Sequence, residues 1–301
     1  MSTREPEIAC RGAVVSEGAR HACGIDEEIG RRLADSRLDL PMLPAVASAV
    51  LTLLDDPDAD AASIASAIRN DQVLAGHVMK YANSPLVRVG APVVSLQQAI
   101  SRLGIRRVGE VALVACLGPK LFKAPRFAGV IDALWRESLA TALWARDIAR
   151  TLRRNVEVSF LCGLLHQIGA PIVLDALQHV LGDGGDADLG APDEAVMTRL
   201  LARHGAAAGQ LVARHWALPE PVCMTIAHVH DFRAAPQSTD VVAMVAVARA
   251  FAQQTPGDAP ADIGRVDAAD AMAEINLYRT DAAALLAQVD AVRKVLREIA
   301  L

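Results

Sequence analysis

Apolar residues recur at α-helical spacing along most of this chain, and this pattern restricts its fold more than any other feature. Within residues 45–54, four apolar side chains occupy positions i, i+3, i+4 and i+7, which places Val46, Ala49, Val50 and Leu53 on one helical face. No segment alternates apolar and polar residues convincingly with the period of two that a half-buried strand requires. The chain is therefore predicted to be all-α.

Capping residues divide the pattern into separate helices. Asp71 and Ser95 are residue types that accept hydrogen bonds from the first turn of a helix, and Gln98 completes a capping-box pattern with Ser95. Gly104 is typical of a helix end, and so is Gly169. Further helices are expected over residues 105–117, 135–152, 160–168, 193–217, 221–230, 240–253 and 282–299.

Four segments follow from this reading. Residues 1–25 lack periodicity and are predicted to form a poorly ordered N-terminal extension. Residues 26–127 form a first helical half, and residues 128–260 form a second. Residues 261–301 form a C-terminal helical tail, which docks either on its own core or on another subunit.

Composition excludes several classes of protein. Of the 301 residues, 52% are hydrophobic and 22% are charged, which argues against disorder for the bulk of the chain. The net charge of -5 comes from interspersed acidic and basic residues, and only 3% of residues are aromatic, so nucleic acid is not an expected partner. The N-terminus lacks the apolar core of a secretory signal, and no cysteines form a Cys-x-x-Cys pair. We expect a cytoplasmic protein that is not attached to a membrane.

Six short motifs occur in one order along the chain: Leu40-Pro41-x-Leu43-Pro44, Asp71-x-x-Leu74 with Tyr81-Ala82-Asn83-Ser84, Ser95-Leu96-x-x-Ala99-Ile100-x-x-Leu103-Gly104, Leu134-Trp135-x-x-Ser138-Leu139, Phe160-x-x-Gly163-Leu164-Leu165-His166-x-Ile168-Gly169, and Trp216-x-Leu218-Pro219 with Ile226 and His230. In their order and spacing these motifs resemble the HDOD family, and the resemblance covers residues 38 to about 250. It implies an HDOD fold, in which an N-terminal helical bundle packs on an HD-like helical subdomain with a C-terminal helix.

The resemblance also implies where a metal site would lie. HDOD proteins are related to the metal-dependent HD phosphohydrolases and HD-GYP phosphodiesterases, whose histidine and carboxylate ligands hold metals that activate water. In this chain the matching positions are a vestigial site of seven residues: Glu137, His166, Gln167, Gly205, Val229, His230 and Arg249.

Most of these seven residues are poor metal ligands. Gln167 replaces the aspartate of the hallmark His-Asp pair and has no anionic oxygen. Arg249 lies near the expected position of another aspartate, and its charge would repel a cation. His166 is expected to bond a neighbouring carbonyl, and His204, beside Gly205, is expected to point elsewhere. We therefore expect no bound metal, no other cofactor and no catalysis.

Three functions remain open from the sequence. The leading hypothesis is a bacterial regulatory module that binds signalling proteins of a two-component or cyclic-dinucleotide pathway. The alternative is a divergent metal-dependent phosphohydrolase acting on nucleotides or cyclic dinucleotides, and a third reading is nucleotide binding without turnover. Guanidinium groups bind phosphate well. Three arginines are therefore candidate contacts for an anionic partner: Arg102, Arg106 and Arg107.

Overall fold

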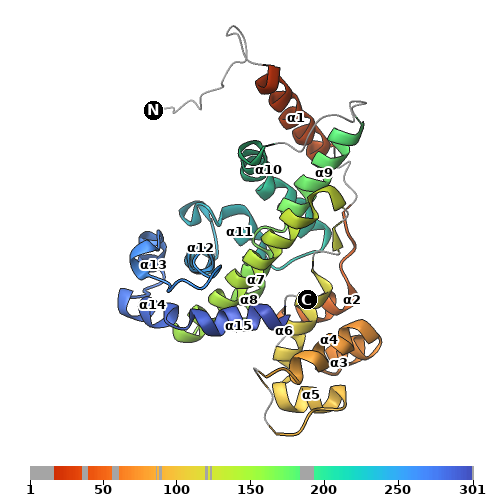
Figure 1. Cartoon of the computed structure of the whole chain (residues 1–301), viewed down its shortest axis with the longest axis vertical. Coiled ribbons are helices and arrows are strands. Elements are labelled where there is room, and N and C mark those ends of the chain that lie inside the picture. Colours follow the sequence, from red (N-terminus) through yellow and green to blue (C-terminus); the bar gives the residue numbers. More distant parts are fainter. Residues whose placement is uncertain are drawn as a thin grey trace.

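A computed structural model describes residues 17–35, 40–55, 61–85, 87, 90–118, 121–122, 124–183 and 193–299. These residues form α-helices and short 3-10 helices joined by turns, with no strand among them (Figure 1). The prediction of an all-α protein is confirmed.

The first half of the chain forms a small bundle at one end of the molecule (Figure 1). Helix α6 is its centre, because α2, α3, α4 and α5 all pack against it. The bounds of these helices are α2 (Ala45–Asp55), α3 (Ala61–Arg69), α4 (Gln72–Ala82), α5 (Leu96–Leu103) and α6 (Ile105–Cys116).

The second half is built around α7 (Ala128–Thr151), which packs against α8, α12 and α15. A continuous apolar core extends through both halves of the molecule. The remaining elements are η2 (Pro125–Phe127), α8 (Val156–Leu165), α9 (Gly169–Asp183), α10 (Glu194–His215), α11 (Glu220–His228), η3 (Phe232–Ala234), α12 (Thr239–Ala252), η4 (Ile263–Arg265), α13 (Ala269–Glu274), α14 (Arg279–Leu286) and α15 (Val289–Ile299).

The predicted caps of the first half are confirmed. The Asp71 carboxylate accepts hydrogen bonds from the backbone N–H groups of Val73 and Leu74, both at 3.0 Å. Ser95 Oγ accepts from the Gln98 N–H at 3.2 Å. The Gln98 side chain accepts from the Val94 N–H at 2.8 Å, one residue before the position that a standard capping box uses.

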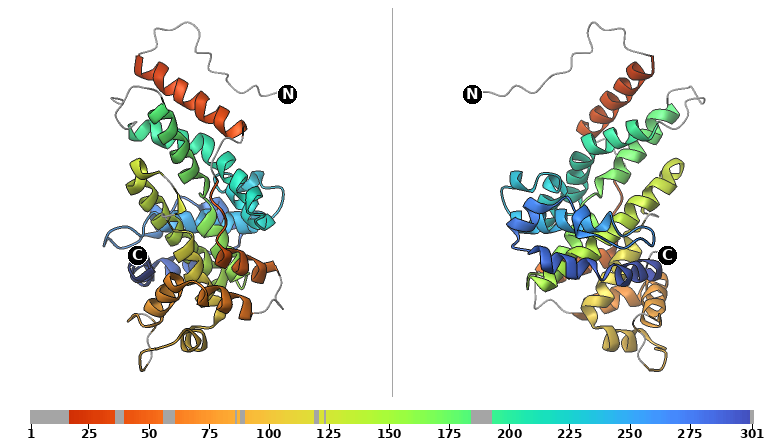
Figure 2. Two further views of the ribbon diagram at one scale, coloured as in Figure 1. Left: turned by 90° about the vertical axis from the view of Figure 1, so that its right-hand side faces the viewer. Right: turned by 60° about the vertical axis from the view of Figure 1, so that its left-hand side comes forward.

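The N-terminal helix begins earlier than expected and lies in a different half. Helix α1 (Glu17–Ala34) starts inside the segment 1–25 that was predicted to be poorly ordered; residues 1–16 lie outside the described part of the chain. It packs against α9 and α10 rather than on the first bundle (Figure 2). The side chains of Ile25, Ile29 and Leu33 form an apolar stripe on α1 that is buried in the folded chain.

Gly169 begins a helix, so the prediction that it ends one is wrong. A Cβ atom at Gly169 would lie 2.0 Å from the Gly205 carbonyl oxygen and 2.3 Å from the Gly209 backbone nitrogen. The absence of a side chain therefore allows α9 and α10 to approach closely. Close packing between helices explains this glycine better than helix termination does.

The apolar stretch Val156–Gly182 is long enough and apolar enough, by composition, to cross a membrane. In the structure 89% of its most apolar window is buried inside the protein. Such burial is typical of the core helices of a soluble protein. The stretch also divides into α8 and α9, with a turn between them.

The C-terminal tail docks on its own chain, where α15 packs against α7 and α6. The predicted helix over residues 282–299 is broken between α14 and α15. Arg293, buried to 7% exposure, holds α15 in place. Its guanidinium donates to the carbonyl oxygens of Thr255 at 2.9 Å and Ala259 at 2.7 Å, and it pairs with Asp290 at 2.8 Å.

Replacing Arg293 is expected to destabilise the protein. The Arg293→Met variant keeps an apolar stem but leaves the carbonyls of Thr255 and Ala259 without this donor, so we expect a loss of about 2 kcal/mol of unfolding free energy. Urea denaturation of the two proteins measures the difference. The matched control is Lys294→Met at the neighbouring exposed position, and an equal loss in both variants would contradict the role of Arg293.

Candidate functional site

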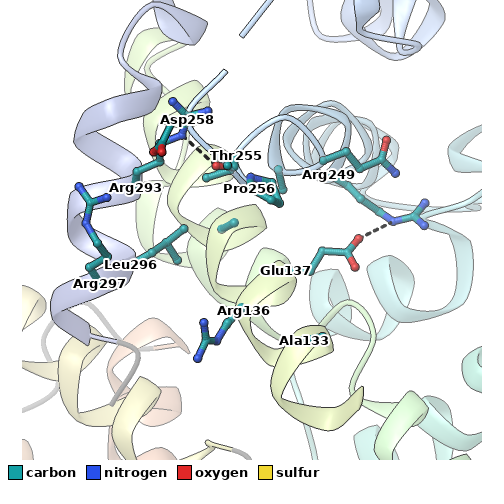
Figure 3. Close-up of a pocket in the computed structure, with 14 residues that line it drawn as sticks. Ala133, Arg136, Glu137, Arg249, Thr255, Pro256, Asp258, Arg293, Leu296 and Arg297 are labelled. Carbon is teal, nitrogen blue, oxygen red and sulfur yellow. Dashed lines mark hydrogen bonds and ion pairs between the residues drawn. The ribbon is translucent and has the colours of Figure 1, made fainter. Parts of the chain in front are cut away.

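Three residues of the predicted vestigial site form a connected cluster. Arg249 on α12 lies between Glu137 on α7 and His230, which follows α11. Its Nε atom is 3.7 Å from Oε1 of Glu137, and its Nη1 atom is 3.2 Å from Nδ1 of His230. Figure 3 shows Arg249 directed towards Glu137. A permanent positive charge therefore lies at the centre of the cluster.

The contact with Arg249 determines which nitrogen of His230 carries a proton. A guanidinium only donates hydrogen bonds, so Nδ1 of His230 must be the acceptor and the neutral ring carries its proton on Nε2. Partial burial and the charge of Arg249 both lower the pKa of His230, which favours this neutral form. In this arrangement neither nitrogen of His230 offers a free lone pair to a metal ion.

His166 is held in the neutral form by burial. Its Nδ1 atom lies 2.8 Å from the Gly163 carbonyl oxygen, which can only accept, so the proton is on Nδ1. This bond to a neighbouring carbonyl confirms the sequence prediction. Burial lowers the pKa of His166 to about 4, and the charges of Arg249 and His230 add to the effect. Its Nε2 atom is buried and has no hydrogen-bond partner.

The Gln167 side chain points towards α7. Its Nε2 atom donates to the Leu134 carbonyl oxygen at 2.9 Å and to Ser138 Oγ at 3.0 Å. Through these two hydrogen bonds, Gln167 links α7 to the turn after α8, which is a structural role.

The other two vestigial positions offer no ligand. Val229 is buried in the core, and Gly205 lies where α10 meets the start of α9. The adjacent His204 points away from the site, as predicted, because its Nε2 atom is 2.7 Å from Oδ1 of Asp26 on α1.

The residues present do not fit the metal site of an HD phosphohydrolase. Within the described ranges, no three histidine, cysteine, aspartate or glutamate side chains are placed to hold a metal ion together. Among the seven vestigial positions, His166 Nε2 is the nitrogen whose lone pair is buried and has no hydrogen-bond partner in the described structure. One imidazole, with a carboxylate at Glu137 that pairs with the Arg249 guanidinium, is a poor donor set for a divalent metal.

The three arginines proposed as anion contacts all have partners within the chain. Arg102 donates to the Ala91 carbonyl oxygen at 2.7 Å. Arg106 pairs with Glu157 and Arg107 with Glu110, both at 2.7 Å. These contacts account for the arginines without a ligand, and their role towards an anionic partner stays a prediction.

Comparison with known proteins decides the family. The family model described as HDOD domain matches residues 40–232, which is more than half of the chain. The chain belongs to the HDOD family. Among curated proteins, an uncharacterized protein of Treponema pallidum (strain Nichols) is 24% identical over 238 residues, covering 77% of this chain. The match covers 46% of that relative, so the chain spans less than half of its length.

Several solved structures share the fold. An HDOD domain protein of unknown function from Geobacter sulfurreducens is 26% identical, covers 91% of this chain and 99% of its own, and gives a TM-score of 0.68. A Shewanella amazonensis SB2B protein, named as a candidate phosphohydrolase, is 19% identical, with coverages of 90% and 98% and a TM-score of 0.63. A Marinobacter aquaeolei VT8 protein, named as a candidate signal transduction protein, is 17% identical, with coverages of 93% and 67% and a TM-score of 0.67.

A pocket that the sequence did not predict lies beside the cluster in this HDOD protein. Glu137 and Arg249 also line a cavity of about 980 Å³ between α7, α12 and α15 (Figure 3). Arg136 and Arg297 line it as well; Arg136 occupies an unspecified position of the motif that begins at Leu134, and Arg297 lies outside the motifs. The sequence feature that could have indicated the pocket is Arg293, a charged residue beside Val292 in the apolar stripe of the C-terminal tail.

Proposed function

We propose that this HDOD chain is a non-catalytic regulatory module that acts by binding signalling proteins, and that its HD-type metal site is vestigial. The observation that carries the proposal is the position of Arg249 between Glu137 and His230. The positive charge of this guanidinium repels a divalent cation. Its hydrogen bond also uses the lone pair on Nδ1 of His230. Within a phosphohydrolase mechanism, the metal would have to activate the attacking water.

The remaining features support the same function. The Gln167 amide is used within the fold, and the net charge of -5 does not favour nucleic acid as the partner. We propose a cytoplasmic location and partners from two-component or cyclic-dinucleotide signalling. The second candidate function, a divergent metal-dependent phosphohydrolase, is favoured by one observation, the buried and unpartnered Nε2 atom of His166.

An assay of phosphodiester hydrolysis separates the two functions. The substrate is bis(p-nitrophenyl) phosphate, and Mn²⁺, Mg²⁺ and Zn²⁺ are supplied separately. We expect the same background rate from the unmodified protein, from His166→Ala and from His215→Ala, an exposed histidine on α10. Turnover that disappears in His166→Ala and persists in His215→Ala would contradict the proposed function.

A further inference from the structure

The pocket beside the vestigial site is large enough for a small-molecule ligand. Its volume of about 980 Å³ compares with the roughly 300–1,000 Å³ of typical ligand sites. It lies between helices, where bundle proteins often place such sites. Its lining combines charged side chains with small apolar ones: Ala133, Arg136, Glu137, Ala140, Arg249, Ala252, Gln253, Thr255, Pro256, Gly257, Asp258, Arg293, Leu296 and Arg297.

The charge of the pocket is opposite to that of the whole protein. Four arginines and two carboxylates line it, a net charge of +2 in a chain of net charge -5. Such a local excess of one sign attracts ligands of the other sign. The pocket therefore favours an anion.

Two of the four arginines are free to bind a ligand. Arg293 uses its donors within the fold, and Arg249 pairs with Glu137 and His230. Arg136 on α7 and Arg297 on α15 are exposed, and within the described residues neither has a hydrogen-bond or ion-pair partner. Figure 3 shows both on the side of the pocket formed by α7 and α15.

These groups match the chemistry of a phosphorylated molecule. Guanidinium forks form paired, charge-assisted hydrogen bonds with phosphate oxygens. Leu296, Pro256 and the alanines offer apolar surface to an organic ring, and the carboxylates of Glu137 and Asp258 can accept from hydroxyl or amino groups.

We propose that the pocket binds a phosphorylated small molecule of up to nucleotide size, with Arg136 and Arg297 holding its phosphate groups. This inference rests on the proposed function, since it supplies the signal that a binding module would receive. The ligand would join α7 to α15, and it would lie against Arg249, the residue that already links Glu137 to His230. Occupancy would therefore connect the C-terminal helix to the vestigial site.

Isothermal titration calorimetry on the full chain tests the proposal with three probes: ATP, inorganic pyrophosphate and adenosine. We expect ATP to bind and adenosine, which has no phosphate, not to bind. Binding of pyrophosphate as well would show that the phosphates suffice, whereas binding of ATP alone would show that the ring contributes; both results support the pocket.

Matched variants locate the binding. Arg136→Gln and Arg297→Gln are each expected to weaken ATP binding about tenfold or more, because each removes charged hydrogen bonds to phosphate. Arg214→Gln, at an exposed position of α10 outside the pocket, removes the same charge and is expected to leave the affinity unchanged. Absence of ATP binding, or equal effects of all three variants, would overturn the proposal.

Chromatography of the ATP recovered after titration separates this inference from the proposed function. Intact ATP is expected. Hydrolysis that requires His166, together with weakened binding in Arg136→Gln and Arg297→Gln, would contradict the non-catalytic function but would leave the pocket assignment in place.

Discussion

The Gly169→Ala variant is expected to lose about 4 kcal/mol or more of unfolding free energy, enough to prevent stable folding. The added Cβ would lie 2.0 Å from the Gly205 carbonyl oxygen and 2.3 Å from the Gly209 nitrogen. Both are backbone atoms, so no side-chain rotation relieves the contact. The helices α9 and α10 would have to separate, and the core between them would open.

Gly205→Ala is the matched control on the facing helix. A Cβ atom at Gly205 would meet nothing within 4 Å, and alanine favours a helix by up to about 1 kcal/mol over glycine. We expect this variant to be as stable as the unmodified protein or slightly more stable in thermal and urea denaturation. Equal stability of Gly169→Ala and Gly205→Ala would contradict the close packing of α9 and α10.

The protein is expected to lose about 3 kcal/mol of unfolding free energy through His166 as the pH falls from 6.5 to 4. The pKa of His166 is about 4 in the folded protein, against an ordinary value of 6.5. Between these values the unfolded chain binds a proton that the folded protein excludes, so acid favours unfolding. This contribution to stability is complete above pH 6.5 and absent below pH 4.

The His166→Asn variant tests this pH dependence. Asparagine places an amide near the position of Nδ1, where it can still donate to the Gly163 carbonyl oxygen, but it does not titrate. Urea denaturation at several pH values should show a smaller loss of stability between pH 6.5 and 4 in this variant. The control, His215→Asn at an exposed position, should keep the original slope. An unchanged slope in His166→Asn would contradict the buried neutral state.

Local signals in the sequence predicted the helices of the first half well. Asp71, Ser95 and Gly104 act within a few residues of themselves, because a cap bonds the first turn or ends the last one. Their effect therefore does not depend on the rest of the fold. The apolar stripe of Val46 and Val50 is buried for the same reason, since its spacing alone places these residues on one face.

Long-range packing explains why the predictions for Gly169 and for the N-terminal segment were wrong. Gly169 resembles a helix terminator in its local sequence, but its role depends on Gly205 and Gly209, some forty residues away. The local sequence of α1 does not indicate that this helix packs against the second half of the chain. Its place depends on α9 and α10 and on the contact of Asp26 with His204.

The candidate site was predictable in residue type but not in geometry. The resemblance to the HDOD family identified His166, His230 and Arg249 as the positions to compare. It did not show that Arg249 contacts Nδ1 of His230, because that contact depends on how α12 packs beside α11. The pocket could not be predicted from the sequence for the same reason, because Arg136 and Arg297 come from helices that meet only in the folded chain.

The metal content of the protein, purified without chelator and analysed for manganese, iron and zinc together, tests the central claim most directly. A vestigial site with one available imidazole predicts less than about a tenth of an equivalent of any of these metals. A near-stoichiometric metal that is lost in His166→Ala would contradict that claim and would make phosphoester hydrolysis the function to pursue.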